Sequence, residues 1–339
     1  MMFKQNPIQY IIAAIFALLT ITSCEEESNG GPILPANTGR HSEILVVADS
    51  AIWQTQSGQS LKGIYQKLYP LLLKSEPFFN LIVFEEKDFS SIIKTHKNIL
   101  ILTESDSVNE IKTYENRWAK DQQLLYISLK DDAIINEQIQ NTKESLFDYF
   151  YKADLERIAN KNVDHKLGGL HYEMQKTKGI EFIIPQDFFI VKDTADFVWV
   201  RREKPHLTES ITFFEEDYTD ENQFGLDHIL DVRDSIYKIQ VEGNLENSYM
   251  TTERRFAPEI DTIDINNEFA IRTRGWWKIQ NDFMGGYFVR YTIPDLDRRK
   301  LIHVEAFLYC PKYNKMFYLR ELEAILNSFA FTKNIKKKK

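Results

Sequence analysis

The 339-residue sequence predicts two domains of mixed class, a three-layer α/β domain with a mostly parallel sheet followed by an antiparallel α+β domain. Between residues 43 and 162, apolar runs of strand length alternate with helical patterns, which is typical of βαβ units. After Lys161, segments of alternating apolar and polar residues follow one another with few helices between them. We therefore expect the α/β domain over residues 40–162 and the α+β domain over residues 163–332.

Four continuous apolar runs of the first domain predict strands that are buried on both faces. They are Ile44–Ala48, Leu81–Phe84, Ile99–Leu102 and Leu124–Leu129. Apolar residues at helical spacing predict helices between and after these strands. The expected helices are Leu61–Leu68, which Pro70 stops, then Val108–Trp118 and Ile135–Ala159.

The second domain is expected to begin with a short helix around His165–Lys176, and one helix interrupts its strands at Ile229–Ile239. A closing helix carries the apolar face of Leu319–Phe329. The expected strands are Ile180–Pro185, Phe188–Val191, Phe197–Arg201, Ile211–Phe214, Tyr249–Phe256, Glu268–Arg274, Gly286–Ile293 and Leu301–Cys310.

The first residues have the pattern of a targeting segment rather than of a part of the fold. A lysine, a short apolar run and small residues before Cys24 predict a signal peptide over residues 1–23. Ile21–Cys24 resembles the lipobox of bacterial lipoproteins, which implies cleavage before Cys24 and lipidation of its thiol. Residues 24–39 are then a flexible acidic tether, and Glu25–Glu27 resemble the surface-export signals of Bacteroidota lipoproteins. The alternatives to a lipobox are an ordinary signal peptide with a chance cysteine and an uncleaved anchor. The alternative to an export signal is a simple solvated spacer.

Composition narrows the classes of partner and cofactor. A net charge of −8 argues against nucleic acid, and we interpret the lysines of the basic tail 333–339 as solvated. Only Cys24 and Cys310 occur, so an acylated Cys24 leaves no intrachain disulfide. The usual nucleotide, zinc and serine-hydrolase motifs are absent from the sequence, and we expect no cofactor.

Acidic residues follow several of the predicted parallel strands. Asp49, Glu104 and Asp131 come at strand ends that border the crevice where α/β sheets bind ligands. Their carboxylates are candidate ligands for Mg²⁺ or Ca²⁺. The alternative is that Asp49 and Asp131 cap the helices that follow.

The richest cluster of the second domain is Arg272–Trp277. Arg272, Arg274, Trp276 and Trp277 suggest a platform on which a sugar or another planar ligand stacks, with the arginines binding its polar edge. Neighbouring strand residues point to opposite faces, so a packing role is the alternative for at least one tryptophan.

Two further polar motifs carry weaker hypotheses. Arg233–Ser235 lies within a predicted helix and is expected to form salt bridges on its surface. An Asp-Ser or Asp-Thr pair followed by a small or aliphatic residue resembles the O-glycosylation acceptor of Bacteroidota envelope proteins. The acceptors would be Ser50, Ser107, Thr194, Ser235 and Thr262.

Taken together, the motifs resemble a family of Bacteroidota lipoproteins called domain of unknown function 4837, over residues 39–331. The motifs are Gly39-Arg40, Glu43–Val47, His96–Ile99, Arg233–Ser235, Tyr249–Thr251, Arg274–Trp277, Gly285-Gly286 and Tyr309–Lys312. The second domain also looks like the Mog1/PsbP-type sandwich. The resemblance implies a location and an architecture, and it implies no activity.

We therefore expect a lipoprotein of the cell envelope, attached to the outer membrane through Cys24, that binds a protein or glycan partner without catalysis. The alternative is a metal-dependent enzyme that uses the acidic residues of the first domain.

Overall fold

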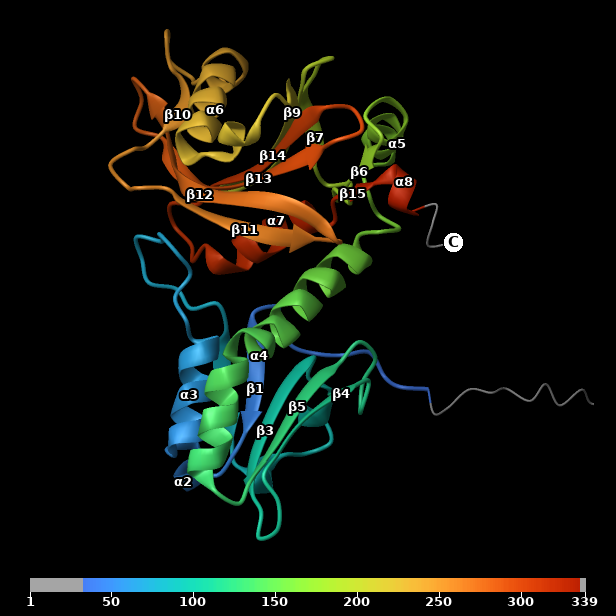
Figure 1. The fold of residues 1–339 in the computed structure, drawn as a ribbon, viewed down its shortest axis with the longest axis vertical. Helices are drawn as coiled ribbons and strands as arrows, with labels where there is room; N and C mark the ends of the chain where they lie inside the picture. Colours follow the sequence, from blue (N-terminus) through green and yellow to red (C-terminus); the bar gives the residue numbers. More distant parts are fainter. Residues whose placement is uncertain (1–32, 336–339) are drawn as a thin grey trace, which may run out of the picture. The chain divides into compact units, whose positions relative to one another are not determined.

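Apolar runs form the centre of a five-stranded sheet in the N-terminal half, which is residues 40–162. The computed structural model of the protein describes residues 33–335 (Figure 1). The sheet has the order β2-β1-β3-β5-β4, and its first four members are parallel. The strands are β1 (Glu43–Val47), β2 (Asn80–Phe84), β3 (Asn98–Glu104), β4 (Glu110–Glu115) and β5 (Gln123–Leu129).

The helix expected over Val108–Trp118 is wrong, because this segment contains β4, which pairs antiparallel with β5. The reason lies in the turn that joins the two strands. Asn116 and Asp121 adopt φ of 53° and 56°, a left-handed conformation that Asn and Asp tolerate, and the Asp121 amide donates to the Asn116 side chain. Asn116 and Asp121 therefore favour a hairpin in a segment whose apolar spacing alone predicted a helix.

Three helices lie on one face of this sheet, α2 (Ser50–Trp53), α3 (Gln56–Tyr65) and α4 (Asp132–Lys161). The starts of α3 and α4 are joined, because the Asp132 carboxylate accepts hydrogen bonds from the amides of Gln56 and Ser57. The opposite face is covered by the 3-10 turns η1 (Glu86–Asp88) and η2 (Ile93–Thr95) and by Trp118.

The C-terminal half, residues 163–332, is built on an antiparallel sheet of order β10-β12-β13-β14-β9-β8-β7, with β11 also paired to β12. Helix α6 (Leu226–Gln240) lies on one face of this sheet and α7 (Met316–Asn327) on the other (Figure 1). The strands are β7 (Phe189–Asp193), β8 (Phe197–Lys204), β9 (Leu207–Asp217), β10 (Tyr249–Thr252), β11 (Glu259–Ile265), β12 (Glu268–Gln280), β13 (Gly285–Asp295) and β14 (Lys300–Tyr309). The fold class expected from the sequence is confirmed in both halves.

Short elements complete the C-terminal half. They are α5 (Gly168–Thr177), η3 (Glu221–Phe224), α8 (Thr332–Ile335) and the two-stranded pair of β6 (Ile180–Glu181) and β15 (Ala330–Phe331). No helix within residues 33–335 is long and apolar enough to cross a bilayer. The signal peptide, Cys24, Glu25–Glu27 and the lysines after Ile335 lie outside the described residues.

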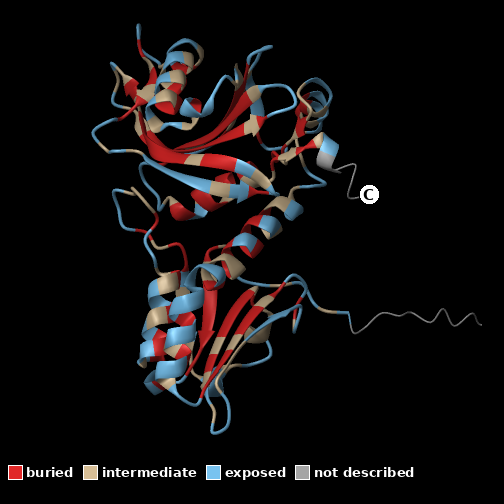
Figure 2. Cartoon of the chain, viewed as in Figure 1, coloured by how far each residue is buried: buried red, intermediate tan, exposed pale blue. Residues whose placement is uncertain are grey.

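The central strands of both sheets are buried along most of their length, and the helices expose one side (Figure 2). The outer strands β2, β4, β7 and β11 are half-buried or exposed. The core of the C-terminal half also contains charge. Arg233 on α6 is fully buried, and its guanidinium contacts the equally buried Glu305 carboxylate at 2.7 Å. Arg290 donates to the same carboxylate at 2.9 Å. The prediction that Arg233 forms a salt bridge on the helix surface is therefore wrong, because this side of α6 faces the sheet.

Residues 36–335 belong to one compact unit, and α4 packs against α7. The loop between α3 and β2 reaches the C-terminal half as well. The Glu76 carboxylate accepts hydrogen bonds from the amides of Lys315 and Met316, where α7 begins. The Tyr69 hydroxyl donates to the buried Glu323 carboxylate at 2.7 Å, which ties the loop to α7.

Candidate functional site

A polar cleft of about 1070 Å³ runs beside the second half of α4. One wall comes from the N-terminal half, with Lys97 before β3, the β4–β5 hairpin and the α4 face of Arg157 and Lys161. The other wall comes from the C-terminal half and includes Asp187 and Arg202. In total 22 residues line the cleft, and most of them are charged or carry a side-chain amide.

Side-chain amides hold the first wall in place. Gln122 is fully buried, and its amide nitrogen donates to the carbonyls of Lys94 and His96 at 2.6 and 2.7 Å. The Asn37 amide donates to the Lys120 carbonyl at 2.8 Å. These bonds join three segments that are distant in the sequence, so the wall is fixed before any ligand arrives.

Basic side chains are prominent on this wall. Arg157 and Lys161 are four residues apart and share one face of α4. The Arg157 guanidinium donates to the carboxylate of Asp154 at 2.7 Å and to the Asn98 side chain at 2.6 Å. Burial lowers the pKa of Lys97, and the nearby Arg157 and Lys161 lower it further, although Asp154 opposes this effect.

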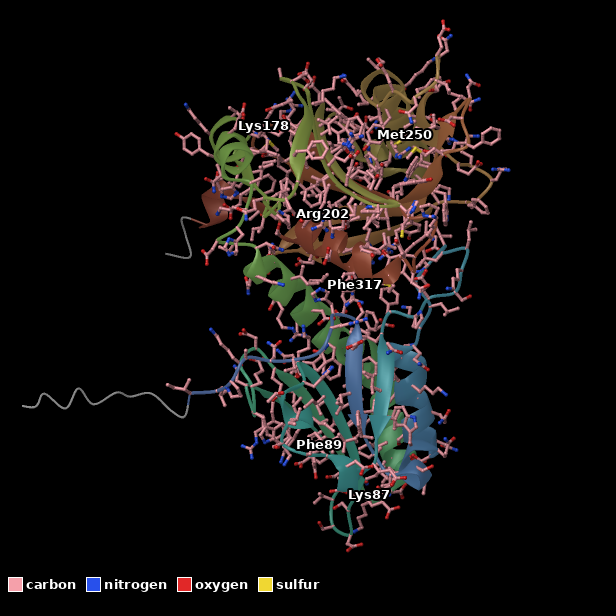
Figure 3. The ribbon with its side chains drawn as sticks, turned by 180° about the vertical axis from the view of Figure 1, so that it is seen from behind. Lys87, Phe89, Lys178, Arg202, Met250 and Phe317 are labelled. Carbon is pink, nitrogen blue, oxygen red and sulfur yellow. The ribbon has the colours of Figure 1, made fainter. Side chains whose placement is uncertain are left out.

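The second wall is organised by Arg202 on β8, which faces α7 (Figure 3). Its guanidinium forms two hydrogen bonds with the buried Glu209, at 2.7 and 2.8 Å. It also contacts Asp187 at 3.0 Å and Glu321 of α7 at 2.6 Å. Burial raises the pKa of Glu209, while Arg202 lowers it. The three carboxylates therefore hold Arg202 in a fixed position at the edge of the cleft.

The predicted metal ligands Asp49, Glu104 and Asp131 are all exposed and are not part of this cleft. Asp131 caps α4, because its carboxylate accepts hydrogen bonds from the amides of Ala133 and Ile134. Within residues 33–335, no three His, Cys, Asp or Glu side chains come close enough together to hold a metal ion. The metal hypothesis thus gains no support from the geometry.

The stacking platform predicted at Trp276 and Trp277 is wrong, because both rings are buried, with 8% and 2% of their surface exposed. They point to opposite faces of β12. Trp276 packs on the α7 side, where its indole nitrogen donates to the Leu71 carbonyl at 2.7 Å. Trp277 packs against Phe307 on the α6 side. Neither ring offers a free face to a ligand.

The two arginines of the same cluster are occupied by partners within the chain. Arg272 forms paired hydrogen bonds with the Asp261 carboxylate, and Arg274 lies 3.4 Å from Asp261 and 3.8 Å from Glu323. These contacts stabilise β11 against β12 and leave no open ligand site there.

The five hydroxyl residues in glycosylation-like motifs are all exposed. They are Ser50, Ser107, Thr194, Ser235 and Thr262. Exposure is necessary for modification, so the glycosylation hypothesis stays a prediction at each site.

Lys97, Arg157, Lys161 and Arg202 were not among the site residues expected from the sequence. The helical spacing of Arg157 and Lys161 was visible in the sequence. Arg202 and Glu209 are only seven residues apart in the sequence. That they face each other across β8 and β9 follows from the register of the two strands, which the sequence alone does not give. Their convergence depends on how the two halves pack.

Comparison with known proteins gives family matches for both halves. Residues 170–328 match the model of the family described as domain of unknown function (DUF4837), and residues 37–163 match the one described as domain of unknown function (DUF8532). Both matches are to domains of unknown function. The match to DUF4837 is narrower than the resemblance expected over residues 39–331, because DUF8532 accounts for the N-terminal half.

No curated protein matches the chain. Among solved structures, the Ran-binding protein Mog1p of Saccharomyces cerevisiae is 7% identical, with a TM-score of 0.31, and the match covers 49% of this chain and 93% of that one. A point mutant of the protein Mog1 is 8% identical, with a TM-score of 0.30, over 45% of this chain and 91% of that one. The human StAR-related lipid transfer protein 5 is 10% identical, with a TM-score of 0.18, over 56% of this chain and 98% of that one.

Proposed function

We propose that the chain is a lipid-anchored lipoprotein of the cell envelope that binds a protein partner in the polar cleft and catalyses no reaction. The glycan version of this hypothesis depended on the tryptophan platform, which is buried. The hypothesis of a protein partner rests instead on the polar cleft.

The observation that carries the proposal is the size and polarity of the cleft. Pockets for small ligands measure about 300–1,000 Å³ and are mostly apolar. This cleft is slightly larger than that range, at about 1070 Å³, and its lining is mostly polar. Its 22 lining residues match the roughly 20–30 residues that one side of a protein interface contributes. Amide and carboxylate groups in such number suit the backbone and side chains of a polypeptide.

Location belongs to the same proposal. The lipobox-like Ile21–Cys24 directs cleavage before Cys24, and acyl chains on its thiol hold the protein at the outer membrane of a Bacteroidota cell. The partner is then another protein of the envelope. Replacing Cys24 by Ala should abolish labelling with palmitate and release the chain from membranes, and a variant that keeps both would contradict the anchor.

The binding role is tested by placing a photo-crosslinking amino acid at single positions of the full-length protein in living cells. Asn160 and Gln186 line opposite walls of the cleft. We expect both positions to capture the same envelope protein, identified by mass spectrometry. Lys143 lies on the same helix as Asn160 but outside the cleft, and it should capture nothing specific. Equal capture from Lys143, or different products from the two walls, would contradict the proposal.

A further inference from the structure

We infer that the first wall of the cleft contains a subsite for a carboxylate, supplied by the polypeptide partner, with Lys97 at its centre. The inference rests on the proposed function and names the chemistry that the partner must present. It is carried by the unpaired amine of Lys97, by the engagement of the nearby carboxylates and by a free donor on Arg157.

The amine of Lys97 is half-buried and has no ion pair within 4 Å among residues 33–335. Removing a charge from water is unfavourable unless the charge is paired, because the charged form loses hydration. The charged residues around the amine act on it in opposite directions, and Asp154 has the largest effect. Arg157 and Lys161 both oppose its charge, and Asp154 and Glu43 favour it only from a distance.

The two nearby carboxylates are already occupied. Asp154 accepts hydrogen bonds from the Ser42 amide at 2.7 Å and from Arg157 at 2.7 Å. Glu43 accepts from the Arg40 amide at 2.9 Å. Both carboxylates are therefore engaged by other donors, and neither forms an ion pair with Lys97.

The guanidinium of Arg157 supplies the third observation. Its Nε–H is buried and has no hydrogen-bond partner among the described residues, although its two terminal nitrogens are engaged. A buried donor without an acceptor is costly, so a carboxylate that accepted from this group would relieve that cost. The nitrogen is not exposed to solvent, so the Arg157 side chain has to shift before a ligand in the cleft can reach it. Charge-assisted bonds from Lys97 and Arg157 are the kind that select carboxylates.

The rest of the lining favours a polypeptide carboxylate over free phosphate. Glu115, Asp121 and Glu156 line the same cleft, and free phosphate has no amide groups to offer them. Their oxygens can accept hydrogen bonds from peptide amides on either side of the bound group. An acidic side chain or a chain terminus within a peptide meets both requirements.

The test uses the mature chain and three probes at low ionic strength: an acetylated tetraglutamate peptide, its tetraglutamine counterpart and inorganic phosphate. We expect saturable binding of tetraglutamate alone by calorimetry, and an affinity that falls as salt increases. Lys97→Gln should weaken this binding about tenfold, since a charge-assisted hydrogen bond is lost. Lys161→Gln, at an exposed position that cannot disturb the core, should weaken it about threefold.

Lys143→Gln is the matched control, because it removes one lysine from the same helix outside the cleft and should leave binding unchanged. Equal binding of phosphate, binding of tetraglutamine, or unchanged affinity in both cleft variants would overturn the subsite. Cross-linking from Asn160 and Gln186 that persists in such a case would leave the proposed function standing. Tetraglutamate binding without any cross-linked partner would contradict the proposed function instead.

Discussion

Replacing Asp154 by Asn should destabilise the protein far more than any exposed substitution on the same helix. Asp154 exposes 1% of its surface and sits where α4 meets α7. Its carboxylate accepts from the Ser42 amide at 2.7 Å, from Arg157 at 2.7 Å and from Arg320 at 3.5 Å. Burial would raise the pKa of Asp154, but Arg320 and Arg157 lower it below its usual value. The group is therefore charged in the folded protein.

An asparagine keeps the shape of the side chain and removes the charge that Arg320 needs. Arg320 is fully buried, and the carbonyl of Phe78 is its other strong hydrogen-bond partner, at 3.0 Å. Breaking one partner of a buried ion pair costs about 3–5 kcal/mol. For folding units of this size, each kcal/mol lowers Tm by about 2–4 °C, so the expected drop is on the order of 10 °C.

The assay is urea unfolding followed by circular dichroism, with Asp148→Asn as the control. Asp148 is on the same helix and pairs with Lys152 at 3.0 Å, but 44% of its side chain is exposed, so its loss should cost under about 0.5 kcal/mol. A difference of less than about 1 kcal/mol between the two variants would refute the reasoning. The cost should also shrink in acid, because the stabilisation from a carboxyl with a lowered pKa is present above its unfolded pKa and lost as the pH falls below it.

Two further outcomes follow from the core of the C-terminal half. Burial lowers the pKa of His303 to about 4, and its Nδ1 lies 3.3 Å from the Arg290 guanidinium, which can only donate, so the ring is neutral in the folded state. As the pH falls, the unfolded chain binds the proton before the folded protein does. The free energy of unfolding should therefore fall by about 3 kcal/mol between about pH 6.5 and pH 4. An equally steep fall in the His303→Gln variant would contradict this assignment. Gly286→Ala should prevent stable folding, because a Cβ there would lie 2.0 Å from the Leu308 carbonyl oxygen, whereas Gly63→Ala meets no atom within 4 Å and should be neutral or stabilising by thermal melting.

Sequence reasoning succeeded where a local pattern decides the structure. The buried strands β1, β3 and β5 and the long helix from Asp132 follow from apolar runs and spacings in the sequence. The strand expected at Leu81–Phe84 is present as β2, but the prediction that it is buried on both faces is wrong, because β2 lies at the edge of the sheet. It failed at β4, where two turn residues with positive φ outweighed the apolar spacing. It also missed β11, whose sequence of alternating acidic and apolar residues is largely exposed and is fixed by pairing with β12.

The candidate site could not be predicted in the same way. Trp276 and Trp277 were selected because tryptophan often binds ligands. Both are buried because β12 lies inside the sheet and both of its faces are covered, which the local sequence does not show. Arg233 illustrates the same limit, since the buried partner Glu305 lies 72 residues further along the chain. Lys97 and Arg202 become neighbours of one cleft only through the packing of α4 against α7, and no short motif encodes that contact.

The length of α4 has a consequence for how the protein is made. Its 30 residues span about 45 Å, and its second half buries Tyr151 and Asp154 against residues of α7. Tyr151 donates to Glu323, which lies 172 residues later in the chain. During the proposed export the N-terminal half therefore emerges long before the surface that completes it. Until α7 arrives, this helix presents apolar and charged groups to water, and incompletely packed surfaces of this kind are prone to aggregation.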